Sequence, residues 1–211
     1  MAEIKLDLSK DIVLDLSKGD YINLSKHALE GNELRAGCGW NCKEVHEIRG
    51  FLFKRDVVSY KDVDLDLIAV LCDANDQFID RVYFHHRHGP GLMLDQDDRS
   101  GSVGPIDIDR VCTTPVLDNE NIYINLREVP AYVSTIKLAV AIYDRNTFED
   151  VVDAYCKLVD VKNNRVLCSF RMSEEGYENT CVHLCNLKRQ GTDWIFEAVG
   201  KYSRKRFNEF M

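Results

Sequence analysis

The chain has 211 residues, of which 45% are hydrophobic, and its 27 Lys and Arg against 35 Asp and Glu give a formal net charge of -8. This composition excludes a disordered, collagen-like or coiled-coil chain, and the length suits one large all-β domain or two small ones. No stretch approaches the ~20 apolar residues that a transmembrane helix requires. The N-terminus lacks the basic head and apolar run of a signal peptide, so we expect a cytoplasmic protein without direct membrane insertion.

The negative charge is concentrated in two segments. Residues 56–80 contain seven acids against one Lys, and residues 95–120 contain seven acids against two Arg, which gives -6 and -5. The two segments together carry -11, so the other residues carry +3. A nucleic-acid-binding protein needs the opposite sign in a patch, and only the short basic run near the C-terminus approaches one. We therefore expect no nucleic-acid partner.

Short alternating segments predict strands along most of the chain. A motif of the type Leu-Asp-Leu-Ser-Lys recurs at residues 5–10, 13–18 and 21–26, with apolar and polar residues alternating as in half-buried strands. Further segments with strand periodicity are separated by turn-forming residues. These predicted strands are 35–40, 63–72, 77–85, 121–126, 135–143, 154–161, 165–172, 179–187 and 194–202.

Two segments differ from this pattern. Thr147 precedes apolar residues at helical spacing as far as Tyr155, and Asp150 stands where a capping box requires an acid, which predicts a short amphipathic helix. Residues 86–120 are rich in Gly, Pro and Asp and are expected to form a long irregular acidic loop. Many strands with one or two short helices predict an all-β, two-sheet β-sandwich, formed by a single domain over residues 1–211.

The most informative segment is the run of alternating aspartates before an apolar stretch. At strand periodicity Asp62, Asp64 and Asp66 lie on one face, ~7 Å apart, and the last two lead into residues 67–71, where solvation decreases. Burying unpaired carboxylates is costly and raises their pKa values, whereas a bound divalent cation compensates their charge. The alternative that these residues form an ordinary solvated acidic surface stays open at this point.

Carboxylate oxygens are hard ligands that suit Ca²⁺ or Mg²⁺, and a loop that can add backbone carbonyls favours the larger ion. Residues 95–101 supply carboxylates and a hydroxyl next to a glycine, and residues 118–120 supply more as the chain enters a strand. No EF-hand loop is present, because no Glu closes an Asp-x-Asp-x-Asp-Gly segment. The spacing therefore indicates a cation site and leaves open whether the ion is Ca²⁺ or Mg²⁺.

The chain resembles the TerD family of bacterial tellurium-resistance and stress proteins from the N-terminal repeats to residue 202. The segments that carry the resemblance are 22–26, 38–40, 62–66, 125–126 with 129–130, 141–143 followed by Phe148, and 191–200. The resemblance implies a β-sandwich that binds two Ca²⁺ ions through acidic loops and has no established enzymatic activity. It also implies other tellurium-resistance or stress proteins as partners, membrane-associated ones among them. The metal ligands that it implies are Asp62, Asp64, Asp66, Asp97, Asp98, Asp118 and Glu120.

The chain departs from the family pattern near two of these ligands. Gln96 replaces a loop glycine, Asn119 replaces an acid, and the connection from Gly101 to Asp118 is longer than usual. Asp107 and Asp109 lie in that longer connection, where they either compensate for the lost acid or are simply solvated.

Other residue clusters allow other interpretations. Three of the six histidines lie at His85, His86 and His88, which suits Zn²⁺. The spacing of Cys181, His183 and Cys185 places all three on one face of a predicted strand, which suits a soft metal. None of the eight cysteines forms a CxxC pair, so most are expected to be buried structural thiols.

Paired carboxylates with a metal also allow a hydrolase, but the sequence shows no phosphate-binding loop, nucleophile elbow or dinucleotide motif. The interpretation favoured over a metal-dependent hydrolase or a zinc-binding protein is a non-enzymatic calcium-binding stress protein. In it, Ca²⁺ orders the acidic loop and so presents an interaction surface.

Overall fold

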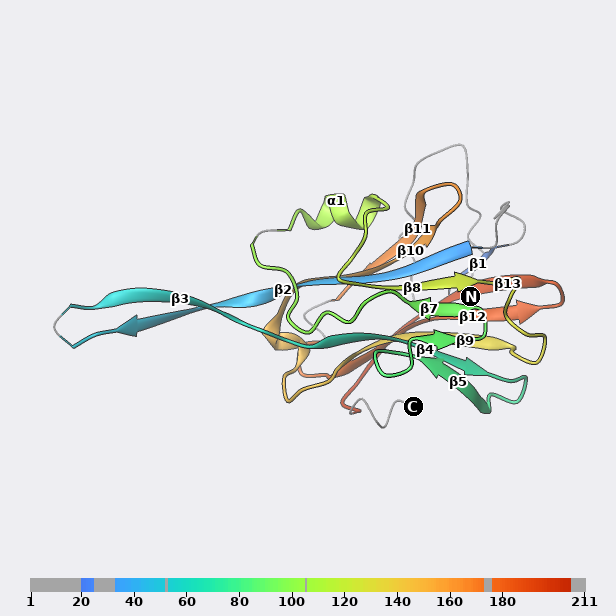
Figure 1. Ribbon diagram of the computed structural model, residues 1–211, viewed down its shortest axis with the longest axis horizontal. Coiled ribbons are helices and arrows are strands. Elements are labelled where there is room, and N and C mark those ends of the chain that lie inside the picture. The colour runs from blue at the N-terminus through green and yellow to red at the C-terminus, as the bar shows by residue number, and fades with distance from the viewer. Residues whose placement is uncertain (1–19, 25–32, 52, 105, 173–175, 206–211) are drawn as a thin grey trace.

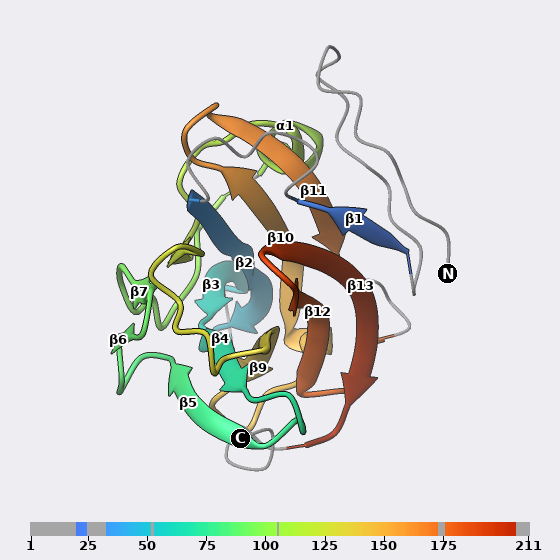
Figure 2. The ribbon, with the colours of Figure 1, turned by 90° about the vertical axis from the view of Figure 1, so that its right-hand side faces the viewer.

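Two antiparallel sheets pack face to face in the computed structural model, which describes residues 20–24, 33–51, 53–104, 106–172 and 176–205 (Figures 1 and 2). The all-β sandwich predicted from the sequence is therefore confirmed. The 6-stranded sheet has the order β1 (Tyr21–Asn23), β13 (Asp193–Ser203), β12 (Cys181–Gln190), β9 (Thr135–Ile142), β4 (Leu65–Cys72) and β5 (Phe78–Val82). The first two copies of the N-terminal repeat lie outside the described residues.

The 7-stranded sheet contains the longest strand of the described chain. Its order is β11 (Arg165–Arg171), β10 (Val151–Asp160), β2 (Glu33–Arg49), β8 (Glu120–Asn125), β7 (Leu92–Leu94) and β6 (His88–Gly89), with β3 (Arg55–Lys61) paired to β2 alone. Alternate residues of both sheets point into the space between them, as the period of a strand requires. Trp40 of β2, Leu67 of β4 and Ile122 of β8 are among the buried side chains that form this core.

β4 is buried on both faces, in agreement with the apolar run at residues 67–71. Leu65 and Leu67 point into the core between the sheets, while Ile68 and Val70 belong to a second apolar cluster on the outer face. All eight of its residues are buried. Asp66 lies within this strand, whereas Asp62 and Asp64 precede it.

The segment from Thr147 to Tyr155 is not the predicted amphipathic helix. Thr147 and Asp150 do form the expected capping box, but the helix is a single 3-10 turn, Phe148–Asp150. The chain then continues as β10, whose residues Val151 and Tyr155 pair with β2. The capping box was predicted correctly because it depends on neighbouring residues. The helix was not, because pairing with the long strand β2 stabilises an extended chain from Val151 onward despite the helical spacing of the apolar residues.

The acidic loop predicted at residues 86–120 contains regular structure. The strands β6 and β7 pair within it, and a helix, α1 (Ile108–Thr113), follows. The side chain of Asp107 caps α1 by accepting a hydrogen bond from the Arg110 backbone N–H. No helix in the described part of the chain is long and apolar enough to cross a membrane.

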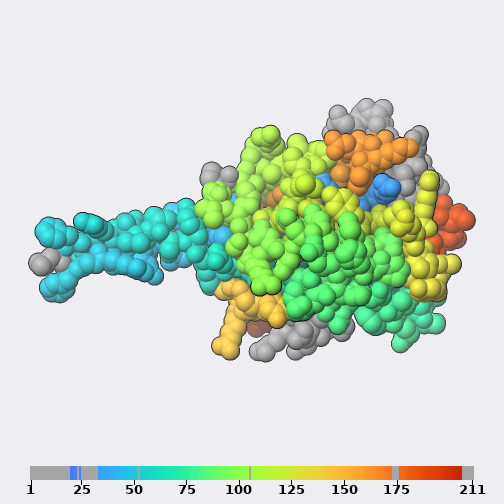
Figure 3. All heavy atoms as spheres, in the orientation of Figure 1, coloured from blue at the N-terminus to red at the C-terminus, as the bar shows by residue number. Residues whose placement is uncertain are grey.

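β2 and β3 continue beyond the sandwich as a two-stranded projection, which we call the arm (residues 43–51 and 53–61). The register runs from Lys43 opposite Lys61 to Arg49 opposite Arg55. Figures 1 and 3 show that the arm stands clear of the sandwich. The sequence-based prediction ended the strand that begins at residue 35 at residue 40 and so missed the arm, because the arm's charged and apolar residues do not alternate regularly.

Candidate metal centre

Three carboxylates converge where the Asp-rich segment meets the acidic loop. One oxygen from each of Asp64, Asp66 and Asp97 lies within 4.8 Å of the other two, and we call this group the aspartate cluster. Asp66 is 1% exposed, and Asp64 and Asp97 are partly buried. The sequence placed all three among the candidate ligands, and the structure brings them together.

The aspartate cluster lies at a part of β4 that its neighbour β5 leaves unpaired. β5 pairs only with Ala69–Cys72, so the backbone N–H of Leu67 needs another acceptor. Glu120, fully buried at the start of β8, supplies it at 2.7 Å and also accepts a hydrogen bond of 3.2 Å from the Asp98 backbone N–H. Glu120 thus joins the two sheets and the acidic loop beside the aspartate cluster.

Burial and mutual repulsion make Asp64 and Asp66 weak acids. Burial, followed by the charges of neighbouring aspartates, raises the pKa of Asp64 to about 6 and that of Asp66 to about 8. Burial also raises the pKa of Glu120 to about 9, despite the hydrogen bond from Leu67. Arg99, which pairs with Asp97 at 3.2 Å, partly offsets the repulsion. The site therefore has excess negative potential that its own cations do not neutralise.

Two buried oxygens of the aspartate cluster lack any hydrogen-bond partner. They are Oδ1 of Asp64 and Oδ2 of Asp66. Buried polar atoms are nearly always paired, so two unpartnered carboxylate oxygens within a group of converging carboxylates are the arrangement that a cation would satisfy. The donor set is all oxygen, which fits Ca²⁺ or Mg²⁺ and does not fit the nitrogen and sulfur preference of Zn²⁺. Asp64, Asp66 and Asp97 are the residues that would hold the ion.

Asp98 organises the loop rather than pointing a free oxygen at the cluster. Its Oδ1 accepts from the backbone N–H groups of Ser100 and Gly101 at 3.0 Å, and its Oδ2 accepts from the amide of Asn119 at 2.8 Å. These hydrogen bonds lower the pKa of Asp98 although burial opposes them. Asn119, noted above as a departure from the family pattern, therefore acts as a donor, which an acid at that position could not do.

Trp40 connects the Asp-rich segment with the loop. Its indole Nε1–H donates to the Val63 backbone carbonyl at 3.0 Å, and its ring lies directly against Gly101. Gly101 has φ +81°, and a Cβ at this position would overlap the indole. Only glycine combines that backbone conformation with this close approach.

Gly101→Ala is expected to destabilise the protein more than Gly104→Ala, by about 1 to 3 kcal/mol in urea unfolding. Both glycines have positive φ, but a Cβ at Gly104 meets nothing within 4 Å. The pair therefore separates the conformational cost, shared by both variants, from the overlap with Trp40. Equal unfolding free energies for the two variants would show that the contact with Trp40 is unimportant.

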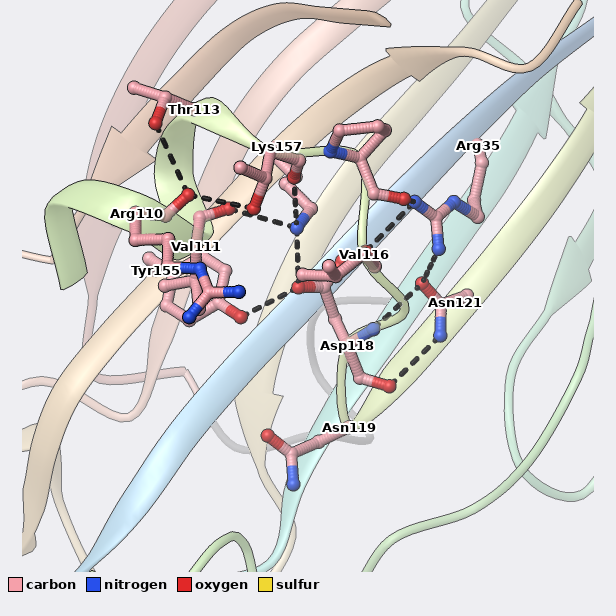
Figure 4. Close-up of polar contacts among 12 residues, drawn as sticks. Arg35, Arg110, Val111, Thr113, Val116, Asp118, Asn119, Asn121, Tyr155 and Lys157 are labelled. Atoms are coloured by element: carbon pink, nitrogen blue, oxygen red, sulfur yellow. Dashed lines mark hydrogen bonds and ion pairs between the residues drawn. The ribbon is translucent and has the colours of Figure 1, made fainter. Parts of the chain in front are cut away.

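Asp118 lies in a different polar network, although the resemblance implied that it is a metal ligand (Figure 4). Its Oδ1 lies 2.9 Å from Lys157 Nζ and accepts a hydrogen bond of 2.6 Å from the hydroxyl of Tyr155. Lys157 also donates to the backbone carbonyls of Val111 and Thr114, which attaches α1 to the sheet. Burial raises the pKa of Asp118 and lowers that of Lys157. The lysine thus supplies a positive charge to Oδ1 of Asp118, while the buried Oδ2 has no hydrogen-bond partner.

Three other acids lie apart from the aspartate cluster. Asp62 is exposed, and its carboxylate lies 3.9 Å from the thiol of Cys42. Asp107 caps α1, and Asp109 pairs with Arg171, so neither replaces the acid lost at position 119.

Asp144, which was not among the candidates, lies near the cluster and raises the pKa of Asp64 and Asp66. Its only signal in the sequence was its position directly after a predicted strand.

The rival metal sites do not form. The aspartate cluster is the only group of three converging metal-ligand atoms among the described residues, which include His85 to His88. A register irregularity between His183 and Cys185 places Cys185 in the core between the sheets and Cys181 in the outer apolar cluster. The prediction that these two thiols share one strand face was therefore wrong. All eight cysteines are free and buried, as expected for structural thiols.

Nearly the whole chain matches a known protein family. The family model of the TerD domain matches residues 12–211. The chain belongs to the TerD family. The TerD-family chain is 27% identical to the tellurium resistance protein TerZ of Serratia marcescens over 186 residues, which cover 88% of both chains. It is 26% identical to the stress response protein SCP2 of Bacillus subtilis over 193 residues, which cover 87% of this chain and 89% of that protein.

Solved structures support the same fold. A crystal structure from Streptomyces coelicolor, described as a homologue of telluride resistance protein (TerD), superimposes with a TM-score of 0.62 at 16% identity. The superposition covers 84% of this TerD-family chain and 94% of that chain. At this identity the likeness concerns the fold alone. The relatives are named as resistance and stress proteins rather than as enzymes.

Proposed function

We propose that this TerD-family protein is a non-enzymatic calcium-binding protein of the bacterial stress response that acts in the cytoplasm. The observation that carries the proposal is Asp66, a buried carboxylate with one orphaned oxygen, next to Asp64 and Asp97. Burial and the neighbouring carboxylates raise the pKa values of Asp64 and Asp66, and a cation at this position would compensate the negative charge of all three residues. Membership in the tellurium-resistance and stress family supports the physiological setting.

The effect of the ion follows from which elements carry the ligands. Asp66 lies in β4 and Asp64 directly precedes that strand, whereas Asp97 belongs to the acidic loop between β7 and α1. An ion shared by these carboxylates ties the loop to the sandwich and so stabilises one loop conformation. We propose that the ordered loop is the surface recognised by other tellurium-resistance or stress proteins, including membrane-associated ones.

Calorimetric titration of metal-free protein with Ca²⁺, Mg²⁺ and Zn²⁺ tests the proposal. We expect Ca²⁺ to bind and to raise the unfolding temperature, because a ligand selective for the folded state stabilises it. The stoichiometry tests the expectation of two ions, of which the aspartate cluster accounts for one. The calcium proposal fails if millimolar Ca²⁺ produces neither heat nor stabilisation, and Mg²⁺-dependent phosphatase or nuclease activity would favour the hydrolase instead.

Calcium affinity is expected to rise with pH between about 6 and 9. Asp64, Asp66 and Glu120 have folded-state pKa values of about 6, 8 and 9, all above those of the unfolded chain. The folded, metal-free protein therefore binds more protons than the unfolded chain in this window, so its stability falls as pH rises. Because Ca²⁺ binds the deprotonated carboxylates, the calcium-bound protein should not show this loss. Titrations and unfolding temperatures across the window, with Ca²⁺ and with EDTA, measure both effects, and a pH-independent affinity would contradict the prediction.

A further inference from the structure

The arm carries the most exposed aromatic side chains of the described chain at its end. Phe51 is 99% exposed and Phe53 is 82% exposed, and Ile48 beside them is 73% exposed. We call residues 48–51 and 53–55 the tip. Soluble proteins seldom expose neighbouring large apolar side chains without an interaction that uses them.

The arm holds the tip away from the sandwich. At its base Lys61 pairs with Asp150 at 2.7 Å, and along its length His46 bridges Glu44 and Asp56 at 2.8 and 2.9 Å. At its end Gly50 adopts φ +107°, and a Cβ there would overlap the Phe53 carbonyl, so the turn requires glycine. Figure 3 shows the arm extending away from the sandwich rather than folding back on it.

The tip has the opposite charge from the rest of the protein. It contains Arg49, Lys54 and Arg55 and no acid, a net charge of +3, so the other residues of the chain carry -11. Arg49 pairs with Glu47 at 2.7 Å, whereas no ion pair of Lys54 or Arg55 occurs among the described residues. The aromatic side chains are thus flanked by cations that are available to an anionic surface.

We propose that the tip docks on an anionic lipid surface, with Phe51 and Phe53 in the interface and the three cations at the headgroups. Aromatic side chains with adjacent Lys and Arg are the composition that favours such an interface. Two phenylalanines supply about 300 to 500 Å², which is less than the roughly 800 Å² that each partner buries in a stable protein interface. A lipid interface surrounds both rings without requiring a complementary surface, so it fits a narrow tip better than a protein groove does.

This mode of contact differs from the sequence-based expectation that the protein does not insert into membranes. That expectation rested on the length of apolar runs, which bears on spanning helices only. Shallow docking of two side chains needs no apolar run, but it needs a projection that separates the tip from the acidic remainder of the chain. At physiological ionic strength the screening length is ~8 Å. Repulsion between that remainder and an anionic surface is therefore weak once the arm holds the two farther apart than this length.

Cosedimentation with vesicles tests the proposal with the full chain and EDTA present, so that calcium bridging by the aspartate cluster does not contribute. We expect binding to vesicles with about 30% phosphatidylglycerol in phosphatidylcholine, and at least tenfold weaker binding to pure phosphatidylcholine. Phe51→Ser/Phe53→Ser should weaken binding at least tenfold. The control Phe78→Ser/Tyr132→Ser removes two aromatic side chains that are exposed on the sandwich, and it should bind as the unmodified protein does.

A charge variant and a fluorescent variant give independent measurements. Lys54→Gln/Arg55→Gln should weaken binding by about fivefold per charge removed, whereas Arg110→Gln/Lys201→Gln removes the same charge from exposed positions elsewhere and should not weaken it. The fluorescence of Phe51→Trp should shift to shorter wavelength on the vesicles, because the new side chain leaves water for the lipid interface. Trp40 and Trp194 are buried, so their emission should not change. Unchanged unfolding temperatures establish that each variant is folded.

Several results would overturn the proposal. These are no binding to anionic vesicles at low salt, tip variants that bind as well as the controls, or an unshifted Phe51→Trp spectrum. Self-association in sedimentation velocity that requires Phe51 and Phe53, without vesicle binding, would instead identify a second copy as the occupant.

Discussion

Replacing Lys157 by methionine is expected to lower the free energy of unfolding by about 3 to 5 kcal/mol. The side chains of Lys157 and Asp118 are both 0% exposed, so removal of the cation leaves a buried carboxylate without its ion-pair partner. The backbone carbonyls of Val111 and Thr114 lose the same donor, which weakens the attachment of α1 to the sheet (Figure 4). Urea unfolding monitored by fluorescence measures the change.

Two variants serve as controls for this prediction. Lys188→Met removes the cation of a more exposed pair with Glu197 and is expected to cost at most about 1 kcal/mol. Lys157→Met/Asp118→Asn removes both buried charges and should recover part of the lost stability. If Lys157→Met is as mild as Lys188→Met, Asp118 does not depend on the lysine, and its role as a metal ligand becomes the better explanation.

The substitution Asp66→Asn is expected to remove most of the stabilisation by calcium. At a Ca²⁺ concentration of 100 times Kd, binding stabilises the folded protein by about 2.7 kcal/mol, which corresponds to a rise of about 5 to 11 °C in unfolding temperature. Asn at position 66 is neutral, so it weakens the ion site. It also relieves the repulsion from Asp64 and Asp97, so the metal-free variant should be no less stable than the unmodified protein.

Asp62→Asn is the matched control for Asp66→Asn. Both positions belong to the same alternating run, and both were candidate ligands by resemblance, but Asp62 is exposed and lies apart from the aspartate cluster. We expect Asp62→Asn to retain the rise in unfolding temperature. If calcium stabilises Asp66→Asn as strongly as it stabilises the unmodified protein, the ion does not bind at the aspartate cluster. Loss of the effect in Asp62→Asn alone would place the ion at Asp62 rather than at the aspartate cluster.

Much of the candidate site could be predicted from local sequence. The alternation at Asp64 and Asp66 is a property of neighbouring residues, and the adjoining apolar run correctly indicated that solvation decreases there. Asp97 and Glu120 were recognised through the family resemblance, and both lie at the site. The capping box of Thr147 and Asp150 was also readable, because a cap depends on residues three positions apart.

Other features depended on contacts between distant residues. Asp118 and Glu120 are two residues apart, yet Glu120 reaches the Leu67 N–H in the opposite sheet while Asp118 pairs with Lys157 of β10. Cys181 and Cys185 were predicted on one face, but an irregularity in the pairing of β12 separates them. Strand pairing also turned the predicted helix after Thr147 into β10. None of these outcomes has a signal within a short window of sequence.

The sequence by itself determined the all-β class, membership in the TerD family and the location of the acidic segments, because periodicity, motifs and charge are recorded along the chain. Only the tertiary structure decided which carboxylates converge, which are neutralised by a lysine, and that a basic aromatic tip stands apart from an acidic body. The physical reason is strand register. A shift of one residue moves a side chain to the other face of a sheet, and the register is set by partners that lie tens of residues away.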